Sequence, residues 1–322
     1  MSIYISGSLA YDRVMSFPGL FSQYILPDKI SLLNVCFPVS RMEEKRGGSG
    51  GNIAYTLALL GEKGLLLSSV GRDFGPYMDF LRGLGLPLEG IHTLPDELTA
   101  GAYITTDQQA NQITVFHSAA MNTPCGYAFS HLDPKTDLAI ISPVGALDME
   151  AHARFYHERG VRYIFDPGQQ IAALSPQALL AGISGAAVLT SNAYELDLIL
   201  SILNLKIQDL LALTPAVITT LAEQGSIVRT RDGGETLIRA VPLKQAQDPT
   251  GAGDAYRAGL LKGLRLGLSL EDAARLGSAC ASFCVEKQGA QEHLFSPREL
   301  NQRLQKNYAL KPLAFTPLLP VN

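Results

Sequence analysis

The sequence contains no tryptophan, four cysteines and only 17% charged residues among its 322 positions. The cysteines, at positions 36, 125, 280 and 284, lack the paired Cys-x-x-Cys spacing of a zinc site. This usage gives no sign of a disulfide framework and agrees with a reducing compartment. We therefore expect a cytoplasmic protein in which Cys280 and Cys284 lie one turn apart on a buried helix face.

The sequence also lacks blocks of like charge and long apolar runs. A formal net charge of −4 argues against a general nucleic-acid binder, which normally carries a basic face. No apolar run approaches the roughly 20 residues that cross a bilayer, and the first residues lack the basic start and apolar stretch of a signal peptide. We expect the partner to be a small molecule rather than a nucleic acid or a membrane.

Two familiar nucleotide-binding motifs are missing as well. The fingerprint Gly-x-Gly-x-x-Gly fails after Gly251 because Tyr256 occupies the position of the third glycine. A P-loop requires Gly-Lys followed by Ser or Thr, and the dipeptide Gly-Lys occurs nowhere in the chain. The dinucleotide-binding and P-loop folds are therefore both disfavoured.

What the sequence does contain is an alternation of short apolar runs and helical patterns. Strands are expected at 3–5, 64–70, 138–141, 163–165, 187–189 and 217–219, and helices at 52–60, 77–84, 149–159, 193–203 and 207–213. This order predicts an α/β fold with a doubly wound, mostly parallel sheet flanked by helices. Ligands of such sheets lie beyond the carboxyl ends of the strands.

Two segments interrupt the alternation. Residues 11–45 and 98–121 are richer in aromatic residues and in polar/apolar alternation, which predicts half-buried hairpins of a small antiparallel sheet. We expect this sheet to be a lid on a large nucleotide-binding and catalytic domain formed by residues 1–10, 46–97 and 122–322. Within that domain, the proline-rich tail from residue 311 onward is expected to lie on the surface.

The segment Asp248-Pro-Thr-Gly-Ala-Gly-Asp254 leads into a helical pattern at 255–266. Small residues at a helix start leave backbone N–H groups open to an anion, which the helix dipole also favours. Taken alone, Asp254 could equally be an N-terminal carboxylate that interacts with the dipole. A carboxylate beside a phosphate site would repel its ligand, so a base that accepts the proton of an attacking hydroxyl explains the pair better.

Five motifs resemble those of the ribokinase-like (PfkB) carbohydrate and nucleoside kinase family. Its two glycine signatures resemble Gly47–Gly61 and Asp248–Leu260, and its Asn-x-x-Glu element resembles Ser191–Glu195. Gly71-Arg-Asp-Phe-Gly75 and Asp166-Pro-Gly also fit. The motifs follow the family order over nearly the whole chain.

Within the family, residues 11–19, 26–28 and 111–121 are most similar to adenosine-kinase-type bacterial nucleoside kinases. The resemblance implies ATP-dependent phosphorylation of a nucleoside 5′-hydroxyl, with adenosine favoured. One alternative is a kinase acting on ribose, fructose or a sugar phosphate, and another is a non-catalytic nucleoside or nucleotide sensor. The sequence departs from its relatives in His-Ser-Ala-Ala-Met at 117–121 and in Gly-Gly-Ser-Gly-Gly at 47–51. Both segments are expected where the lid meets the substrate, so the identity of the substrate's nucleobase stays open.

The resemblance also implies the catalytic roles. Asp254 would be the general base, and the backbone amides of Gly251, Ala252 and Gly253 would form the anion hole for the transferring phosphoryl group. A monovalent cation such as K⁺ is expected beside this loop, near Asp248.

For ATP and its metal, the resemblance implies that Asn192 and Glu195 organise Mg²⁺ through water, which suits an ion that gives up its hydration reluctantly. Thr220 and Gly225 would flank the ATP ribose and phosphates, and residues 279–291 would border the adenine. Asn192 and Glu195 could instead form only a helix capping box.

On the substrate side, Asp12, Gly48 and Asn52 would bind the ribose hydroxyls, and Phe116 on the lid would stack on the base. Asp12 could otherwise be a turn residue, Gly48 a packing glycine and Phe116 an ordinary lid aromatic. Exposed edge strands of the lid could pair between two chains, which predicts a homodimer.

Overall fold

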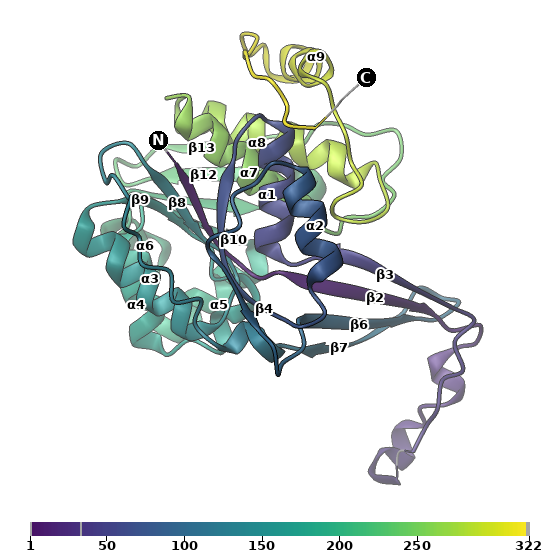
Figure 1. The fold of residues 1–322 in the computed structure, drawn as a ribbon. Helices are drawn as coiled ribbons and strands as arrows, with labels where there is room; N and C mark the ends of the chain where they lie inside the picture. The colour runs from purple at the N-terminus through teal and green to yellow at the C-terminus, as the bar shows by residue number, and fades with distance from the viewer. Residues whose placement is uncertain (1, 33, 320–322) are drawn as a thin grey trace.

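The structure of the chain is a computed structural model that describes residues 2–32 and 34–319 (Figure 1). Within these residues, the larger of two sheets has nine strands in the order β13-β12-β11-β10-β9-β8-β1-β4-β5. The strands from β5 to β11 are parallel, and β12 and β13 extend the edge as an antiparallel meander. Their bounds are β1 Ile3–Ser6, β4 Gly64–Gly71, β5 Ile91–Leu94, β8 Leu138–Ile141, β9 Arg162–Phe165, β10 Val188–Asn192, β11 Ala216–Thr220, β12 Ser226–Thr230 and β13 Glu235–Ile238.

Alternate residues of each central strand enter two different apolar cores. In β1, Ile3 and Ile5 pack on one face of the sheet and Tyr4 packs on the other. One group of helices covers the first face: α1 (Ser49–Leu59), α2 (Gly75–Gly83), α7 (Ala252–Arg265), α8 (Leu270–Val285) and α9 (Pro297–Tyr308). The other face carries α3 (Ala146–Arg159), α4 (Pro176–Gly185), α5 (Ala193–Leu203) and α6 (Ile207–Leu213). The predicted doubly wound α/β fold is confirmed.

The second sheet forms the lid and has the order β3-β2-β6-β7. Its strands are β2 (Ala10–Ser16), β3 (Arg41–Gly47), β6 (Ala100–Thr106) and β7 (Gln112–His117). The expectation of a wholly antiparallel sheet was wrong, because β2 and β6 pair in parallel. Both strands enter the lid from the carboxyl ends of parallel strands, β1 and β5, and therefore run in the same direction.

The lid extends away from the large sheet into an arm that contains two short 3₁₀ helices, at Phe21–Gln23 and Pro27–Leu32 (Figure 1). Aromatic side chains hold the base of this arm: Phe17 stacks on Phe21, and Phe37 contacts both rings edge-on. In the described part of the chain, 3₁₀ helices also lie outside the arm, at Ala119–Asn122, Gly168–Ala172 and Ala222–Gln224. The residue boundaries between lid and large domain stay a prediction.

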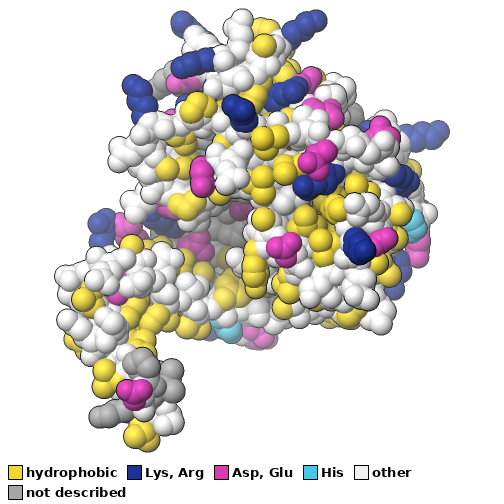
Figure 2. Space-filling view, turned by 180° about the vertical axis from the view of Figure 1, so that it is seen from behind, with side chains coloured by type: hydrophobic (Ala, Val, Ile, Leu, Met, Phe, Trp, Pro, Cys, Tyr) yellow, Lys and Arg dark blue, Asp and Glu magenta, His cyan; other side chains and the backbone are white. Residues whose placement is uncertain are grey.

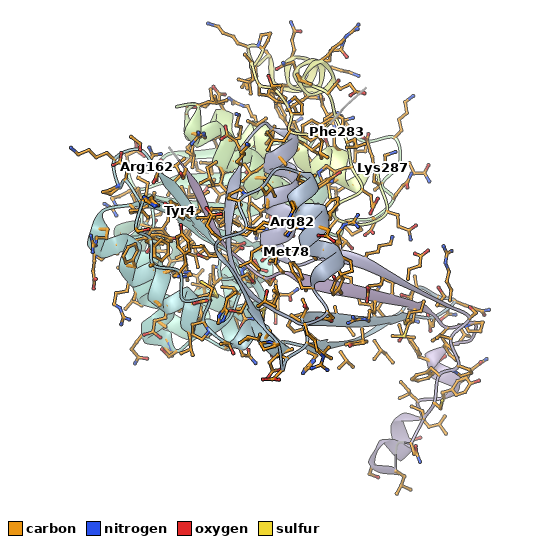
Figure 3. The ribbon with its side chains drawn as sticks, in the orientation of Figure 1. Tyr4, Met78, Arg82, Arg162, Phe283 and Lys287 are labelled. Carbon is orange, nitrogen blue, oxygen red and sulfur yellow. The ribbon has the colours of Figure 1, made fainter. Side chains whose placement is uncertain are left out.

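The carboxyl ends of the parallel strands face the lid. Arg162, the first residue of β9, lies at the side of the sheet remote from the lid, as does Tyr4 near the start of β1 (Figure 3). This arrangement directs the loops that follow the strands toward the space beneath the lid.

Two smaller expectations have different outcomes. Cys280 and Cys284 are buried on α8, as predicted. The C-terminal tail is not a plain surface segment, because Phe315 and Leu318 pack against the core and the Leu318 N–H donates to the Ala58 carbonyl at 2.9 Å. Residues 320–322 of that tail lie outside the described residues. None of the described helices is long and apolar enough to cross a membrane.

Candidate active site

Asp254 lies in the first turn of α7, with its side chain only 16% exposed. Its Oδ2 accepts a hydrogen bond of 2.8 Å from Nδ2 of Asn52, a residue of α1 that is 202 positions away in the sequence. Asn52 Oδ1 in turn accepts from Gln291 Nε2 at 2.9 Å, and the same nitrogen donates to the Tyr77 hydroxyl. This chain of contacts fixes which way the Asn52 amide faces and thereby orients the carboxylate of Asp254.

The second oxygen of Asp254 faces a cation. Arg257, one turn along α7, places Nη1 3.8 Å from Asp254 Oδ1. Burial raises the pKa of the Asp254 carboxyl, while Arg257 and the hydrogen bond from Asn52 act in the opposite direction. A carboxylate with a raised pKa is a better proton acceptor, provided that it still ionises at working pH.

The start of α7 carries no side-chain cap. Gly251 has a φ of +79°, and a Cβ at this position would collide with the Cβ of Ala290. The Ala252 N–H, one of the three amides expected to form the anion hole, instead donates to the Pro249 carbonyl at 3.1 Å and is engaged in the tight turn into the helix. Asp248 secures both sides of this turn, since its carboxylate accepts from the N–H groups of Thr250 and Gly289, each at 2.9 Å. The loop is therefore narrow and ordered before any ligand arrives.

Asp12 of β2 faces the same region from the lid. A Cβ on Gly47 would come within 2.5 Å of Asp12 Oδ2, so glycine at position 47 makes room for this carboxylate. The pKa of Asp12 is raised to about 6, first by burial and then by the charges of Asp254 and Asp248. Gly48 has a φ of +85° at the start of α1, and a Cβ there would overlap the Ser8 carbonyl oxygen.

Phe116 lies on β7, opposite Ala102, and is 50% exposed. Among the described residues, none of the Asp254 cluster contacts Phe116, so its role in stacking on a substrate base stays a prediction. Figure 2 shows a hollow between the lid and the body of the molecule.

Asn192 and Glu195 form the reciprocal capping box that was the alternative reading. Asn192 Oδ1 accepts from the Glu195 N–H, and Glu195 Oε2 accepts from the Asn192 N–H, both at 2.8 Å. The charge of Glu195 nevertheless contributes to the raised pKa values of Asp254 and Asp166, which places it beside the same cluster. One oxygen of Glu195 lies outside the box, so the residue can still bind a water of a hydrated Mg²⁺.

Thr220 and Gly225, which were also expected on the ATP side, lie at the two ends of the turn between β11 and β12. Thr220 ends β11, and its hydroxyl lies 3.5 Å from the Ser191 carbonyl. Gly225 has a φ of +102°, and a Cβ there would strike the Ile238 carbonyl oxygen, so local packing also requires glycine here. A place for Thr220 and Gly225 beside ATP stays a prediction. Within the segment 279–291, the side chain of Gln291 is directed to Asn52 on the substrate side. Contact of that segment with an adenine stays a prediction.

Three residues of the cluster received no role from the sequence: Tyr77, Asp166 and Arg257. Gln291 was expected only as part of the segment 279–291 that would border the adenine. Arg257 could have been found, because a residue three positions after Asp254 lies on the same helix face. Gln291 and Tyr77 follow no local pattern, and only tertiary packing brings them to Asn52.

Comparison with known proteins identifies the family to which the chain with this arrangement of residues belongs. A match to the pfkB family carbohydrate kinases covers residues 25–296. The chain belongs to this family of carbohydrate kinases. As a member, it is a kinase that transfers a phosphoryl group to a hydroxyl group.

The relatives of this kinase include nucleoside kinases. The nucleoside kinase of Methanothermobacter thermautotrophicus is 31% identical over 303 residues, which cover 91% of this chain and 95% of the relative. The structure of Burkholderia thailandensis nucleoside kinase in complex with inosine has a TM-score of 0.83 at 35% identity and covers 97% of this chain and 100% of its own. The same protein in complex with ADP-inosine has a TM-score of 0.80 at 36% identity, with 97% of each chain covered.

Proposed function

We propose that this kinase transfers the γ-phosphoryl group of ATP to the 5′-hydroxyl of a nucleoside, with adenosine the favoured substrate. The observation that carries the proposal is the hydrogen bond from Asn52 to Asp254. It joins the first turn of α1, at the glycine-rich segment where ribose hydroxyls are expected, directly to the expected base. The similarity to nucleoside kinases supports the same substrate class.

In this reaction Asp254 accepts the proton of the 5′-hydroxyl while the hydroxyl oxygen forms a bond to the γ-phosphorus. The bond between that phosphorus and the β,γ-bridging oxygen breaks, and its electron pair leaves with ADP. Amides at the uncapped start of α7 receive the negative charge of the transferring group. Asp12 and Asn52 orient the sugar through its vicinal hydroxyls, which fixes the distance of the 5′-oxygen from Asp254.

Mg²⁺ would neutralise charge on the ATP phosphates, and Glu195 would hold it through water, with Asn192 beside it. The capping box keeps the Glu195 carboxylate in place before the metal binds. A monovalent cation near Asp248 and a homodimer formed through the lid remain part of the proposal. Light scattering that gives a monomer mass would remove the dimer.

The test is an assay of ADP release with Mg-ATP and a panel of acceptors: adenosine, inosine, guanosine, cytidine, ribose, fructose and fructose 6-phosphate. Turnover with adenosine above the other acceptors is the expected result. Turnover with inosine or another nucleoside instead would retain the proposed reaction but replace adenosine as the favoured substrate. Turnover with a free sugar alone would overturn the nucleoside proposal. If none of the acceptors in the panel led to ADP release, a non-catalytic sensor would be favoured.

A further inference from the structure

Arg257 is held by a buried carboxylate that the reaction described above does not use. Its Nη2 donates to Asp166 Oδ1 at 2.7 Å, and its Nε forms an ion pair with Asp166 Oδ2. Asp166 directly follows the central strand β9 and is completely buried. This two-point contact fixes the plane of the guanidinium as well as its position.

The third nitrogen of Arg257 is directed at the start of α7. Nη1 lies 3.8 Å from Asp254 Oδ1, beyond hydrogen-bond distance, and a Cβ on Gly253 would come within 2.5 Å of it. Within residues 2–32 and 34–319, Nη1 has no hydrogen-bond acceptor, whereas Nη2 and Nε are both engaged with Asp166. A charged donor therefore faces the same space as the amides of the expected anion hole.

The charges around Arg257 keep it protonated. Burial lowers the pKa of its guanidinium, but the carboxylates of Asp166 and Asp254 more than offset this and raise it above its ordinary value. Negative charge on three neighbouring carboxylates, those of Asp166, Asp254 and Glu195, would also repel an incoming triphosphate unless a cation stood among them.

We propose that Arg257 is a catalytic residue whose Nη1 donates a hydrogen bond to a non-bridging oxygen of the γ-phosphoryl group during transfer, and that Asp166 is the positioning residue that aims it. The proposal rests on the proposed function. Arg257 keeps its proton throughout, since the proton of the hydroxyl goes to Asp254 and the electron pair of the broken bond goes to ADP. A preorganised cation of this kind stabilises the charge that develops in the transition state.

Two other roles for Arg257 make different predictions. If the ion pair with Asp166 is only structural, its loss lowers stability and weakens all ligands together. If Arg257 only lowers the pKa of Asp254, its removal shifts the acid limb of the kcat/KM profile to higher pH, and the rate recovers on the alkaline plateau. A donor to the phosphoryl group instead lowers kcat at every pH.

The experiment compares Arg257→Gln, Arg257→Lys and Asp166→Asn with the matched control Lys262→Gln. Lys262 is a buried cation on the same helix, about 12 Å along the axis from Asp254, and pairs with Glu62 at 2.6 Å. Glu62 also pairs with Arg265 at 2.7 Å and so keeps a cationic partner in the control. The control should lower the melting temperature and leave kcat within twofold.

With the nucleoside that the wild-type chain accepts, Arg257→Gln should reduce kcat by about a hundredfold on the plateau of the pH profile, with the nucleoside KM within about twofold. It should also abolish the extra affinity for ADP with tetrafluoroaluminate and nucleoside over ADP alone. Arg257→Lys should recover part of the rate, because it keeps the charge without the planar fork, and Asp166→Asn should lower kcat with a smaller effect.

Wild-type kcat in Arg257→Gln would overturn the proposal, as would full recovery at high pH or an equal loss of ADP and tetrafluoroaluminate-complex affinity. In each of those outcomes the wild-type chain still phosphorylates its nucleoside, so the proposed function stands. A wild-type chain without acceptor-dependent ADP release would overturn both proposals.

Discussion

Two helices begin beside the same group of charged residues, and they begin in opposite ways. At the start of α5, Asn192 and Glu195 bind each other's backbone N–H groups, which satisfies the end of the helix internally. At the start of α7, Gly251 adopts a left-handed backbone conformation and no side chain caps the helix. Glycine in place of a capping Ser, Asn or Asp typically costs only about a few tenths of a kcal/mol of stability.

On the function proposed above, this difference reserves one of the two helix ends for an anion. At the start of α5 the backbone N–H groups of Asn192 and Glu195 are hydrogen-bonded without a ligand. Only side-chain atoms outside the capping box remain available to bind one. The end of α7 leaves backbone donors for a ligand and surrounds them with side chains that are already in place, namely Asn52, Asp254 and Arg257. The uncapped end should therefore govern the rate, and the capped end should govern stability and metal use.

The largest effect is expected at the carboxylate of α7. Asp254→Asn removes the proton acceptor but can still accept the hydrogen bond from Asn52, so kcat should fall by about a hundredfold or more while ADP affinity and melting temperature change little. Steady-state kinetics, calorimetric titration with ADP and thermal unfolding measure these three quantities. Near-normal turnover would show that Asp254 is not the base and that the start of α7 does not govern the rate.

A smaller effect is expected when the uncapped end is distorted. Gly251→Ala places a Cβ against Ala290 and forces alanine into a left-handed conformation that costs about 1–2 kcal/mol. We expect kcat to fall by about tenfold, because the amides lose their aim, together with a drop of a few degrees in melting temperature. Gly233→Ala is a suitable control, since Gly233 also has a positive φ but an added Cβ meets open space. If both variants lose the same activity, the geometry of the α7 start is not what limits the rate.

At the capped end, the metal role can be separated from the capping role. Glu195→Gln retains an oxygen for the capping box and removes only the charge, so the melting temperature should stay nearly constant. The Mg²⁺ concentration for half-maximal rate should rise several-fold, because a neutral amide binds the hydrated ion less well. Asn192→Ala should instead lower stability by about 1 kcal/mol. An unchanged Mg²⁺ requirement in Glu195→Gln would assign this end a structural role alone.

The smallest effect concerns Asp12, whose raised pKa reflects burial and then the neighbouring charges of Asp254 and Asp248. Its carboxyl gains a proton as the pH falls through about 6, so the nucleoside KM should rise several-fold between pH 7 and 5. The effect on folding has the opposite sign. Since this pKa is 3.8 in an unfolded chain, the group favours the ligand-free fold most at low pH, and that contribution is lost between about pH 4 and 6. Asp12→Asn should flatten the KM profile in this range, and an unchanged profile would exclude Asp12 as the titrating group.

The sequence predicted the parts of the molecule that depend on local patterns. Apolar runs of three to seven residues predicted the central strands, and the glycine-rich segments at the starts of α1 and α7 pointed to Gly48, Gly251 and Asp254. The parallel pairing of β2 with β6 was missed because strand direction in the lid depends on which edge of the large sheet each strand leaves. The contacts of Gln291 and Asp166 were missed for a related reason: their partners lie 239 and 91 positions away, and no periodicity relates them.

One residue, Gly48, separates the last strand residue of the lid from the first turn of α1. A connection this short leaves little slack, so a rotation of β3 turns the start of α1 with it unless the backbone of Gly48 absorbs the whole change. Asn52 stands four positions beyond that pivot, and its amide is the group that contacts Asp254. The angle of the lid is thereby mechanically connected to the contact between Asn52 and Asp254, so a movement of the small sheet would be felt at the carboxylate that we propose as the base.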